Sequence, residues 1–188
     1  MLLGLITYSY VFVFSKPVVE KDLRSQYLKA GNFELNLGDQ SFSLKQLKGK
    51  PVVLYFGYTS CPDVCPVGLA LIRDALNSSE DFQDIPAIFV TLDPERDTAD
   101  KLREYVAFFH KNILPLRGSV EQVKSVIEAY GGFFRFVSQD DQPDTEEISY
   151  LVDHSTYYYL IDAQGDLIRV FDHSLTSLEL AESLRTLL

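Results

Sequence analysis

The chain has 188 residues, of which 46% are hydrophobic and 23% are charged, so it is long enough for one packed domain and lacks the composition of a disordered protein. Its 17 Lys and Arg against 27 Asp and Glu give a formal net charge of −10, which repels a phosphate backbone and excludes nucleic acid as a partner. Two cysteines and a single methionine exclude a disulfide framework, a four-cysteine zinc site and a methionine-rich metal tract. Any thiol chemistry must therefore use Cys61 and Cys65.

An uncharged, apolar run occupies residues 1–15 and ends at Lys16. As a helix it would be about 22 Å long, shorter than the roughly 30 Å hydrocarbon core of a bilayer. It lacks the basic segment and the small-residue cleavage site of a secretory signal. A short membrane anchor, an uncleaved signal-like segment and a buried strand stay open. We favour the anchor, with residues 16–30 as a linker, because Tyr8 and Tyr10 suit a membrane interface.

The first predicted elements of the folded part, residues 31–188, are a hairpin and a buried strand. Apolar and polar residues alternate over Asn32–Leu37 and over Ser41–Leu44, on either side of Gly38-Asp39, which is typical of a hairpin. Pro51–Tyr58 is a continuous run of β-branched and aromatic residues, as expected of a strand that is buried on both faces.

Helical and strand patterns alternate in the middle of the chain. Val67–Leu76 has the apolar spacing of a helix, and Ile85–Leu92 is a second continuous apolar run. A second helix is predicted over Thr98–His110, with Thr98 as its N-cap, and a third over Val120–Tyr130. This βαβα order predicts parallel strands joined by crossover helices.

A second hairpin and a last helix complete the predicted elements. Tyr157–Ile161 and Leu167–Phe171 flank the turn residues 163–166, and Leu178–Leu188 has helical spacing. The predicted class is α/β, with a mixed sheet, flanking helices and an N-terminal hairpin. This arrangement matches a thioredoxin-like fold.

The most informative stretch is the cysteine pair in Cys61-Pro-Asp-Val-Cys65-Pro66, which follows the strand ending near Tyr58. Cys61 is expected in a turn and Cys65 in the first turn of a helix, where Pro66 is well tolerated. Free amides and the helix dipole favour thiolate there, so we expect both sulfurs to be reactive. A structural disulfide over so short a loop would add only about 2 kcal/mol of stability. We therefore favour a redox pair or a metal pair.

A third ligand would decide between redox chemistry alone and metal binding, and the chain has three histidines. His110 stands at the predicted end of a helix, where an imidazolium complements the dipole, and His173 lies in a loop before the last helix. Both therefore have ordinary structural explanations. His154 precedes a strand expected in the central sheet, where loops approach the strand end that carries Cys61. On spacing alone, a ligand role for His154 stays open.

Several segments together resemble the Sco/SenC family of copper chaperones for cytochrome c oxidase. They are FGYTSCPDVCP at 56–66, VTLDPERDT at 90–98, GSVEQV from Gly118, AYG from Ala129 and YLVDHSTYYYLID at 150–162. The resemblance implies a thioredoxin-like domain that is tethered to a membrane, faces the periplasm or the mitochondrial intermembrane space, and binds one copper ion.

The resemblance also assigns residues. It implies that Cys61, Cys65 and His154 are the metal ligands. Asp93 corresponds to an acidic residue near the family's site, although a turn cap after a strand explains it equally well. Family members usually carry a longer anchor that is preceded by basic residues, and residues 1–15 depart from that pattern.

Two thiolates and one imidazole suit Cu(I) and accept Cu(II), whereas zinc would prefer a fourth ligand. The implied partners are the copper-site subunit of cytochrome c oxidase, the membrane that holds the N-terminal segment, and a thiol–disulfide reductant. The reductant matters because oxidation of Cys61 and Cys65 to a disulfide would remove two of the three ligands.

The competing interpretation is an enzyme, either a thiol–disulfide oxidoreductase or a related peroxidase. Three residues separate the cysteines instead of the two of the usual redox motif, and Asp153-His154 stands where a cis-proline signature would precede the last hairpin. Both features favour metal binding. A copper or redox sensor would use the same ligands and stays open. The acidic segment Gln139–Glu147 suits a basic partner surface, but a solvated loop is the simpler explanation.

Overall fold

The computed structural model describes residues 30–138 and 150–188. The predicted anchor at 1–15, nearly all of the predicted linker at 16–30 and the acidic segment at 139–147 lie outside the described residues. Among the helices of the described residues, none has both the length and the apolar character needed to cross a membrane.

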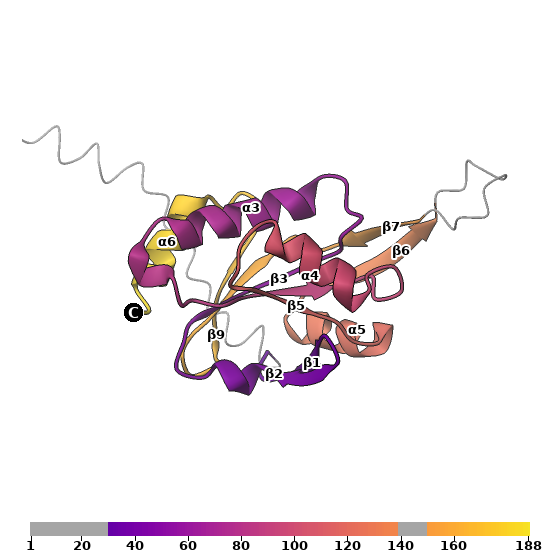
Figure 1. Cartoon of the computed structure of the whole chain (residues 1–188), viewed down its shortest axis with the longest axis horizontal. Coiled ribbons are helices and arrows are strands. Elements are labelled where there is room, and N and C mark those ends of the chain that lie inside the picture. Colours follow the sequence, from indigo (N-terminus) through magenta and orange to yellow (C-terminus); the bar gives the residue numbers. More distant parts are fainter. Residues whose placement is uncertain (1–29, 139–149) are drawn as a thin grey trace, which may run out of the picture.

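Figure 1 shows the elements along the chain. The strands are β1 (Glu34–Leu37), β2 (Gln40–Ser43), β3 (Val52–Gly57), β4 (Ala87–Thr91), β5 (Ile113–Leu116), β6 (Phe134–Ser138), β7 (Tyr150–His154), β8 (Tyr158–Ile161) and β9 (Leu167–Phe171). The helices are α3 (Val64–Asn77), α4 (Ala99–Ala107), α5 (Val120–Ala129) and α6 (Ser177–Arg185), with short 3-10 helices η1 (Leu44–Leu47) and η2 (Glu80–Phe82). Every predicted strand and helix is present, with ends that differ by a few residues.

The central sheet has the strand order β5-β4-β3-β8-β9. β3 pairs with β4 in parallel and with β8 in antiparallel orientation, so that Tyr55 has Phe89 on one side and Tyr158 on the other. β4 and β5 are parallel, and β8 and β9 are antiparallel. The sheet is therefore mixed, and the fold is thioredoxin-like, as the sequence predicts.

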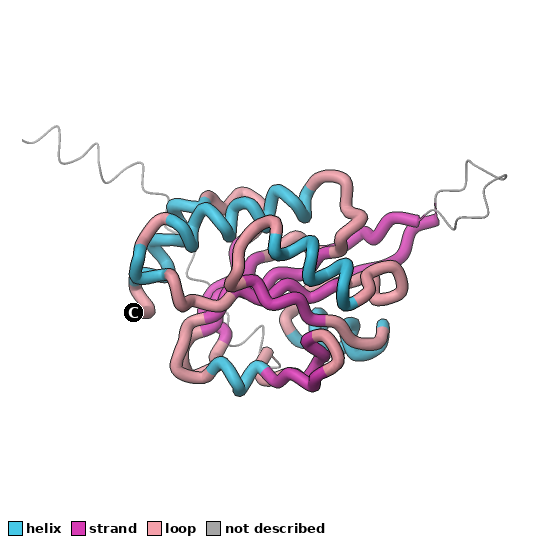
Figure 2. The backbone as a smooth tube through the Cα atoms, viewed as in Figure 1, coloured by secondary structure: helices cyan, strands magenta, loops and turns pink. Residues whose placement is uncertain are grey.

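Both faces of this sheet are covered. α3, α4 and α6 lie over one face, and α5 and the β1–β2 hairpin lie over the other (Figures 1 and 2). Alternate residues of β3 serve the two layers, since Val53 and Tyr55 pack towards α3 and α6, whereas Leu54 and Phe56 pack towards α5 and the hairpin. This double burial explains why the strand is one continuous apolar run.

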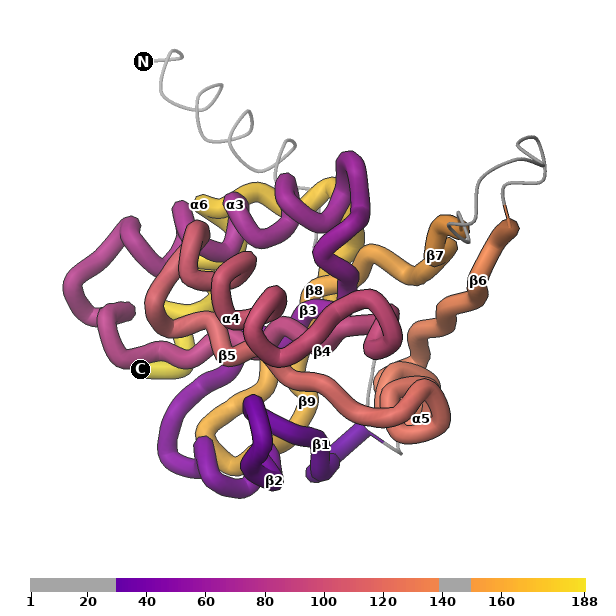
Figure 3. Tube along the Cα trace, turned by 45° about the vertical axis from the view of Figure 1, so that its right-hand side comes forward, coloured from indigo at the N-terminus to yellow at the C-terminus, as the bar shows by residue number. Residues whose placement is uncertain are grey.

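Two parts of the structure were not predicted. β5 forms one edge of the sheet and contains Pro115, a residue that edge strands tolerate because one side needs no ladder bond. β6 and β7 form a separate antiparallel ribbon in which Phe134 lies opposite His154. The ribbon extends beyond the central sheet in two views (Figures 1 and 3). His154 thus ends a strand of its own, four residues before β8 begins.

Candidate metal centre

The two cysteines lie where β3 gives way to α3. Cys61 is in the connecting loop, and Cys65 is, as predicted for this residue, in the first turn of α3, which begins at Val64. The amide of Cys65 lies 3.4 Å from the sulfur of Cys61. Amides in the first turn of a helix have no acceptor within that helix. The free amide of Cys65 is therefore available to donate to the sulfur of Cys61.

His154 reaches the cysteines from the end of β7. Its Nε2 lies 3.6 Å from Sγ of Cys65. One donor atom from each of Cys61, Cys65 and His154 falls within 4.8 Å of the others. The structure therefore brings the three sequence-predicted ligands together at the carboxyl end of β3, although the sequence separates Cys65 from His154 by 89 positions.

A backbone contact sets the orientation of the His154 ring. Nδ1 lies 3.0 Å from the carbonyl oxygen of Ser155, and because a carbonyl only accepts, this contact places a proton on Nδ1. Nε2, on the other side of the ring, faces Cys65. The ring of Tyr58 meets the imidazole edge-on, with 6.0 Å between ring centroids. Histidine ligands of metals are commonly held in this way by a carbonyl on the far nitrogen.

The two thiols differ in acidity. The pKa of Cys61 lies well below that of an ordinary thiol, chiefly because the thiol of Cys65 donates a hydrogen bond to its sulfur, with further support from His154 and from backbone amides. The same pairing, together with burial, raises the pKa of Cys65. The pKa of Cys61 is therefore the lower of the two, and Cys65 is fully buried.

Close packing below the site leaves room for the Cys65 sulfur only because position 57 has no side chain. A Cβ on Gly57 would lie 2.9 Å from Sγ of Cys65 and 2.9 Å from Cε2 of Phe89. Both neighbours are buried, so neither has space to move away. The last residue of β3 therefore determines how closely α3 approaches the sheet.

Gly57→Ala should lower the free energy of unfolding by about 1–3 kcal/mol, the usual cost of overpacking a core. It should also displace the Cys65 sulfur from His154. Urea denaturation measures the first effect. Gly31→Ala is the matched control, because a Cβ there meets nothing within 4 Å. Equal stability of the two variants would contradict the packing described for Gly57.

Asp93 lies in a network beside the donor set. Its side chain is fully buried, forms an ion pair with Arg96 and accepts a 2.6 Å hydrogen bond from the hydroxyl of Tyr150. The amide of Arg96 lies 3.5 Å from its Oδ1, which is the turn-cap geometry considered for this residue. The hydrogen bonds and ion pair described for Asp93 go to these neighbours rather than to the cysteines or His154.

Asp97 was not a predicted site residue, although it lies in the same DPERD segment as Asp93. Its fully buried carboxylate accepts hydrogen bonds from the amide of Thr59 at 2.9 Å and from Oγ1 of Thr91 at 2.6 Å. Thr59 belongs to the cysteine loop, and Thr91 ends β4. Asp97 therefore ties the loop that carries Cys61 to the neighbouring strand. The signal available in the sequence was a second aspartate beside a strand end.

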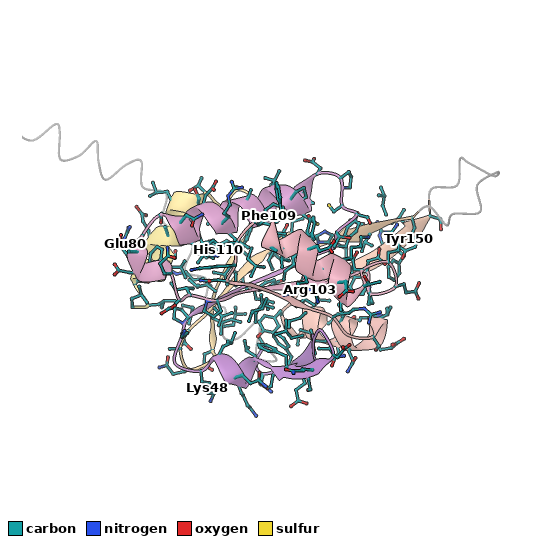
Figure 4. The ribbon with its side chains drawn as sticks, viewed as in Figure 1. Lys48, Glu80, Arg103, Phe109, His110 and Tyr150 are labelled. Atoms are coloured by element: carbon teal, nitrogen blue, oxygen red, sulfur yellow. The ribbon has the colours of Figure 1, made fainter. Side chains whose placement is uncertain are left out.

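The other two histidines lie outside the donor set. His110 comes three residues after the end of α4, and its Nδ1 accepts a 3.1 Å hydrogen bond from the amide of Asn112. Burial lowers its pKa, which disfavours the charged form that would complement the helix dipole. His173 is exposed in the loop between β9 and α6. Figure 4 shows His110 well apart from Tyr150, which begins the strand that ends in His154.

A groove of about 530 Å³ lies beside the donor set. Cys61 and His154 line it, together with Val64 of α3 and with Val137 and Leu151 of the ribbon. Cys65 is not among its lining residues. The site is thus reached from outside through Cys61 and His154.

The sequence was compared with protein families and with known proteins. A family model described as SCO1/SenC matches residues 21–188. The chain belongs to the SCO1/SenC family. A SCO2-like protein of Rickettsia conorii is 36% identical over 157 residues, which cover 82% of this chain and 75% of that protein. The mitochondrial protein SCO2 of Saccharomyces cerevisiae is 40% identical over 141 residues, covering 73% of this chain and 46% of that protein.

Solved Sco structures share the fold. The copper-bound ScoI of Bradyrhizobium japonicum has a TM-score of 0.73 and 34% identity, covering 85% of this chain and 99% of that one. The copper-bound ScoI of Arabidopsis thaliana has a TM-score of 0.74 and 32% identity, covering 84% of this chain and 96% of that one. These similarities confirm the family resemblance and the thioredoxin-like fold.

Proposed function

We propose that this protein binds one copper ion through Sγ of Cys61, Sγ of Cys65 and Nε2 of His154, and delivers it to the copper-site subunit of a cytochrome c oxidase. The donor set carries the proposal, because its three atoms lie within 4.8 Å of one another. Two similar Sco structures are described as having copper bound. The cytochrome oxidase step rests on membership of the SCO1/SenC family.

The chemistry of the donors fits copper as cargo. Soft thiolates favour Cu(I), and the added imidazole makes the set acceptable to Cu(II). Structural zinc sites are almost always four-coordinate, and the group described at this site offers three residues. A carrier must also release its ion, and the groove gives a partner's ligands access to Cys61 and His154.

Oxidation should control copper uptake. Joining the Cys61 thiolate and the Cys65 thiol in a disulfide releases the remaining thiol proton, transfers two electrons to the oxidant and removes two of the three donors. After treatment with diamide and removal of excess reagent, we expect close to no copper bound, and about one ion per chain again after reduction with a phosphine. Thiol titration alongside should show two fewer thiols in the oxidised protein. Undiminished copper binding in that form would contradict the ligand assignment.

We also propose that residues 1–15 hold the protein at a membrane, with the folded part facing the periplasm or the mitochondrial intermembrane space and kept reduced by a thiol–disulfide reductant. The uncharged run supports the anchor. Carbonate-washed membranes should retain the full chain, whereas a variant that begins at residue 17 should appear in the wash. Full release of the unaltered chain would rule out the anchor.

One observation favours a second function, thiol–disulfide exchange. Cys61 has a lowered pKa and lines the groove, whereas Cys65 is buried behind it, which is the arrangement of an attacking and a resolving thiol. Reduction of insulin disulfides separates the two functions. An oxidoreductase should still reduce insulin in His154→Ala, because only the two sulfurs take part in the exchange, whereas a copper carrier should show little reductase activity at all.

A further inference from the structure

The ribbon that carries His154 has no strand ladder to the central sheet in the described part of the chain. Its inward side chains must therefore hold it in place. Burial alternates along β7, so that Tyr150, Val152 and His154 face the body of the protein, and the two residues between them are exposed. The amide of Val152 lies 3.4 Å from the hydroxyl of Tyr58, which secures the middle of the strand.

The first residue of β7 has the most extensive contacts. The hydroxyl of Tyr150 donates to Oδ1 of Asp93 at 2.6 Å, and its carbonyl accepts from Nη1 of Arg96 at 3.0 Å. The guanidinium carbon of Arg96 lies 3.7 Å from the centre of the Tyr150 ring. Arg96 is in turn ion-paired with Asp93. We call these three residues the Tyr150 latch.

The latch is built from strong contacts. Hydrogen bonds that involve a charged partner are roughly twice as strong as neutral ones, and a guanidinium over an aromatic ring adds attraction that burial increases. The Asp93 side chain is fully buried. The latch therefore fixes one end of β7 to the loop between β4 and α4, about 13 Å along the strand from His154 at the usual rise per residue.

We propose that Tyr150 is a positioning residue for His154. Its contacts with Asp93 and Arg96 anchor the start of β7 and so determine where the imidazole at the end of β7 stands relative to Cys65. This inference rests on the proposed function. Cys61 and Cys65 belong to the β3–α3 connection, which the ribbon does not carry. Loss of the latch should therefore weaken the binding of Cu(II), which needs the imidazole of His154. The binding of Cu(I) by the two cysteine sulfurs should be unaffected.

Tyr150→Phe tests this, because it deletes the hydroxyl and keeps the ring under Arg96. We expect Cu(II) affinity to fall by about tenfold, as is usual when a group supporting a metal ligand is removed. The nitrogen coupling in the Cu(II) paramagnetic resonance spectrum should weaken, while Cu(I) stoichiometry stays at one. Arg96→Lys should weaken Cu(II) binding further, because it loses the planar group that meets both the ring and the carbonyl.

The matched control is Tyr130→Phe. It deletes a tyrosine hydroxyl that donates a 2.9 Å hydrogen bond to the carbonyl of Gly31, away from the ribbon. A second measurement needs no metal. Nitrogen chemical shifts of the His154 ring should be the same in the parent protein and in the control, and should report a proton on Nδ1, where the Ser155 carbonyl accepts it. In Tyr150→Phe they should move towards a mixture of tautomers.

The outcomes separate this inference from the function on which it rests. If Tyr150→Phe keeps the parent Cu(II) spectrum while His154→Ala loses it, the positioning role is wrong and the copper function stands. If Cu(I) and Cu(II) binding fall together with the stability of the fold, Tyr150 has a structural role only, and the inference is also overturned. If His154→Ala itself keeps the parent Cu(II) spectrum, the proposed ligand set has failed.

Discussion

Replacing Cys61 or Cys65 with serine should reduce copper in the reduced protein from about one ion per chain to close to none. The two thiolates supply the negative charge and most of the bonding to Cu(I), and a serine hydroxyl is a hard, neutral donor that Cu(I) binds poorly. Copper analysis after equilibration with a competing Cu(I) chelator measures the loss. No other single substitution in this chain should have so large an effect.

The pH dependence of copper affinity tests the role of Cys65 in a second way. The hydrogen bond with Cys61 and burial raise the pKa of Cys65, so that this thiol still holds its proton at neutral pH and must release it when copper binds. Apparent affinity should therefore fall as the pH is lowered, by about tenfold per unit if one proton is displaced. Cys65→Ala should be measured together with Cys65→Ser, because a buried serine hydroxyl without a partner would itself destabilise the fold. Copper retained by a correctly folded Cys65→Ala would contradict the assignment.

His154→Ala should separate the two oxidation states. A two-coordinate dithiolate still suits Cu(I), so we expect about one Cu(I) per chain to remain. Cu(II) prefers more donors and nitrogen among them, so the Cu(II) form should be largely lost together with its thiolate absorption bands. Copper stoichiometry and absorption spectra of the same samples, before and after oxidation of the metal, give both results.

The chain offers two controls for that experiment. His110→Ala removes a buried imidazole that bonds to Asn112, and His173→Ala removes an exposed one. Both should keep the parent Cu(I) and Cu(II) spectra. Loss of the Cu(II) spectrum in His110→Ala, or its survival in His154→Ala, would show that the ligand set is wrong. Thiol–disulfide exchange would then become the better account of the cysteine pair.

The predicted elements that the structure confirms have strong local signals. β3 and β4 are buried along their whole length, and the side chain of Thr98 caps α4 as expected by accepting from the amide of Lys101. β5 was missed because Ile-Leu-Pro-Leu is short and its proline argues against a strand, which an edge position relieves. The ribbon was missed because β6 is largely exposed and because β6 and β7 are far apart in sequence, ending at Ser138 and beginning at Tyr150.

The site residues also differ in how far the sequence predicts them. Cys61 and Cys65 are close in sequence, so a strand followed by a helix was enough to place them together. His154 joins them only through the tertiary structure, and its spacing left a ligand role open until the family resemblance was considered. For Asp97 the sequence offered only a second aspartate beside a strand end, and no pattern indicated a site role for Tyr58. Their roles depend on contacts with Thr59 and with the amide of Val152, which residue order does not reveal.

The groove reaches Cys61 and His154 but not Cys65, and this asymmetry would give the proposed copper transfer a direction. An incoming ligand from a recipient protein meets the ion on the side held by Cys61 and His154, so those bonds should exchange first. The bond from the buried Cys65 would be the last to dissociate. It would keep the ion bound until the recipient has supplied at least one ligand of its own. Handover would then proceed without free copper ever entering the surrounding solvent.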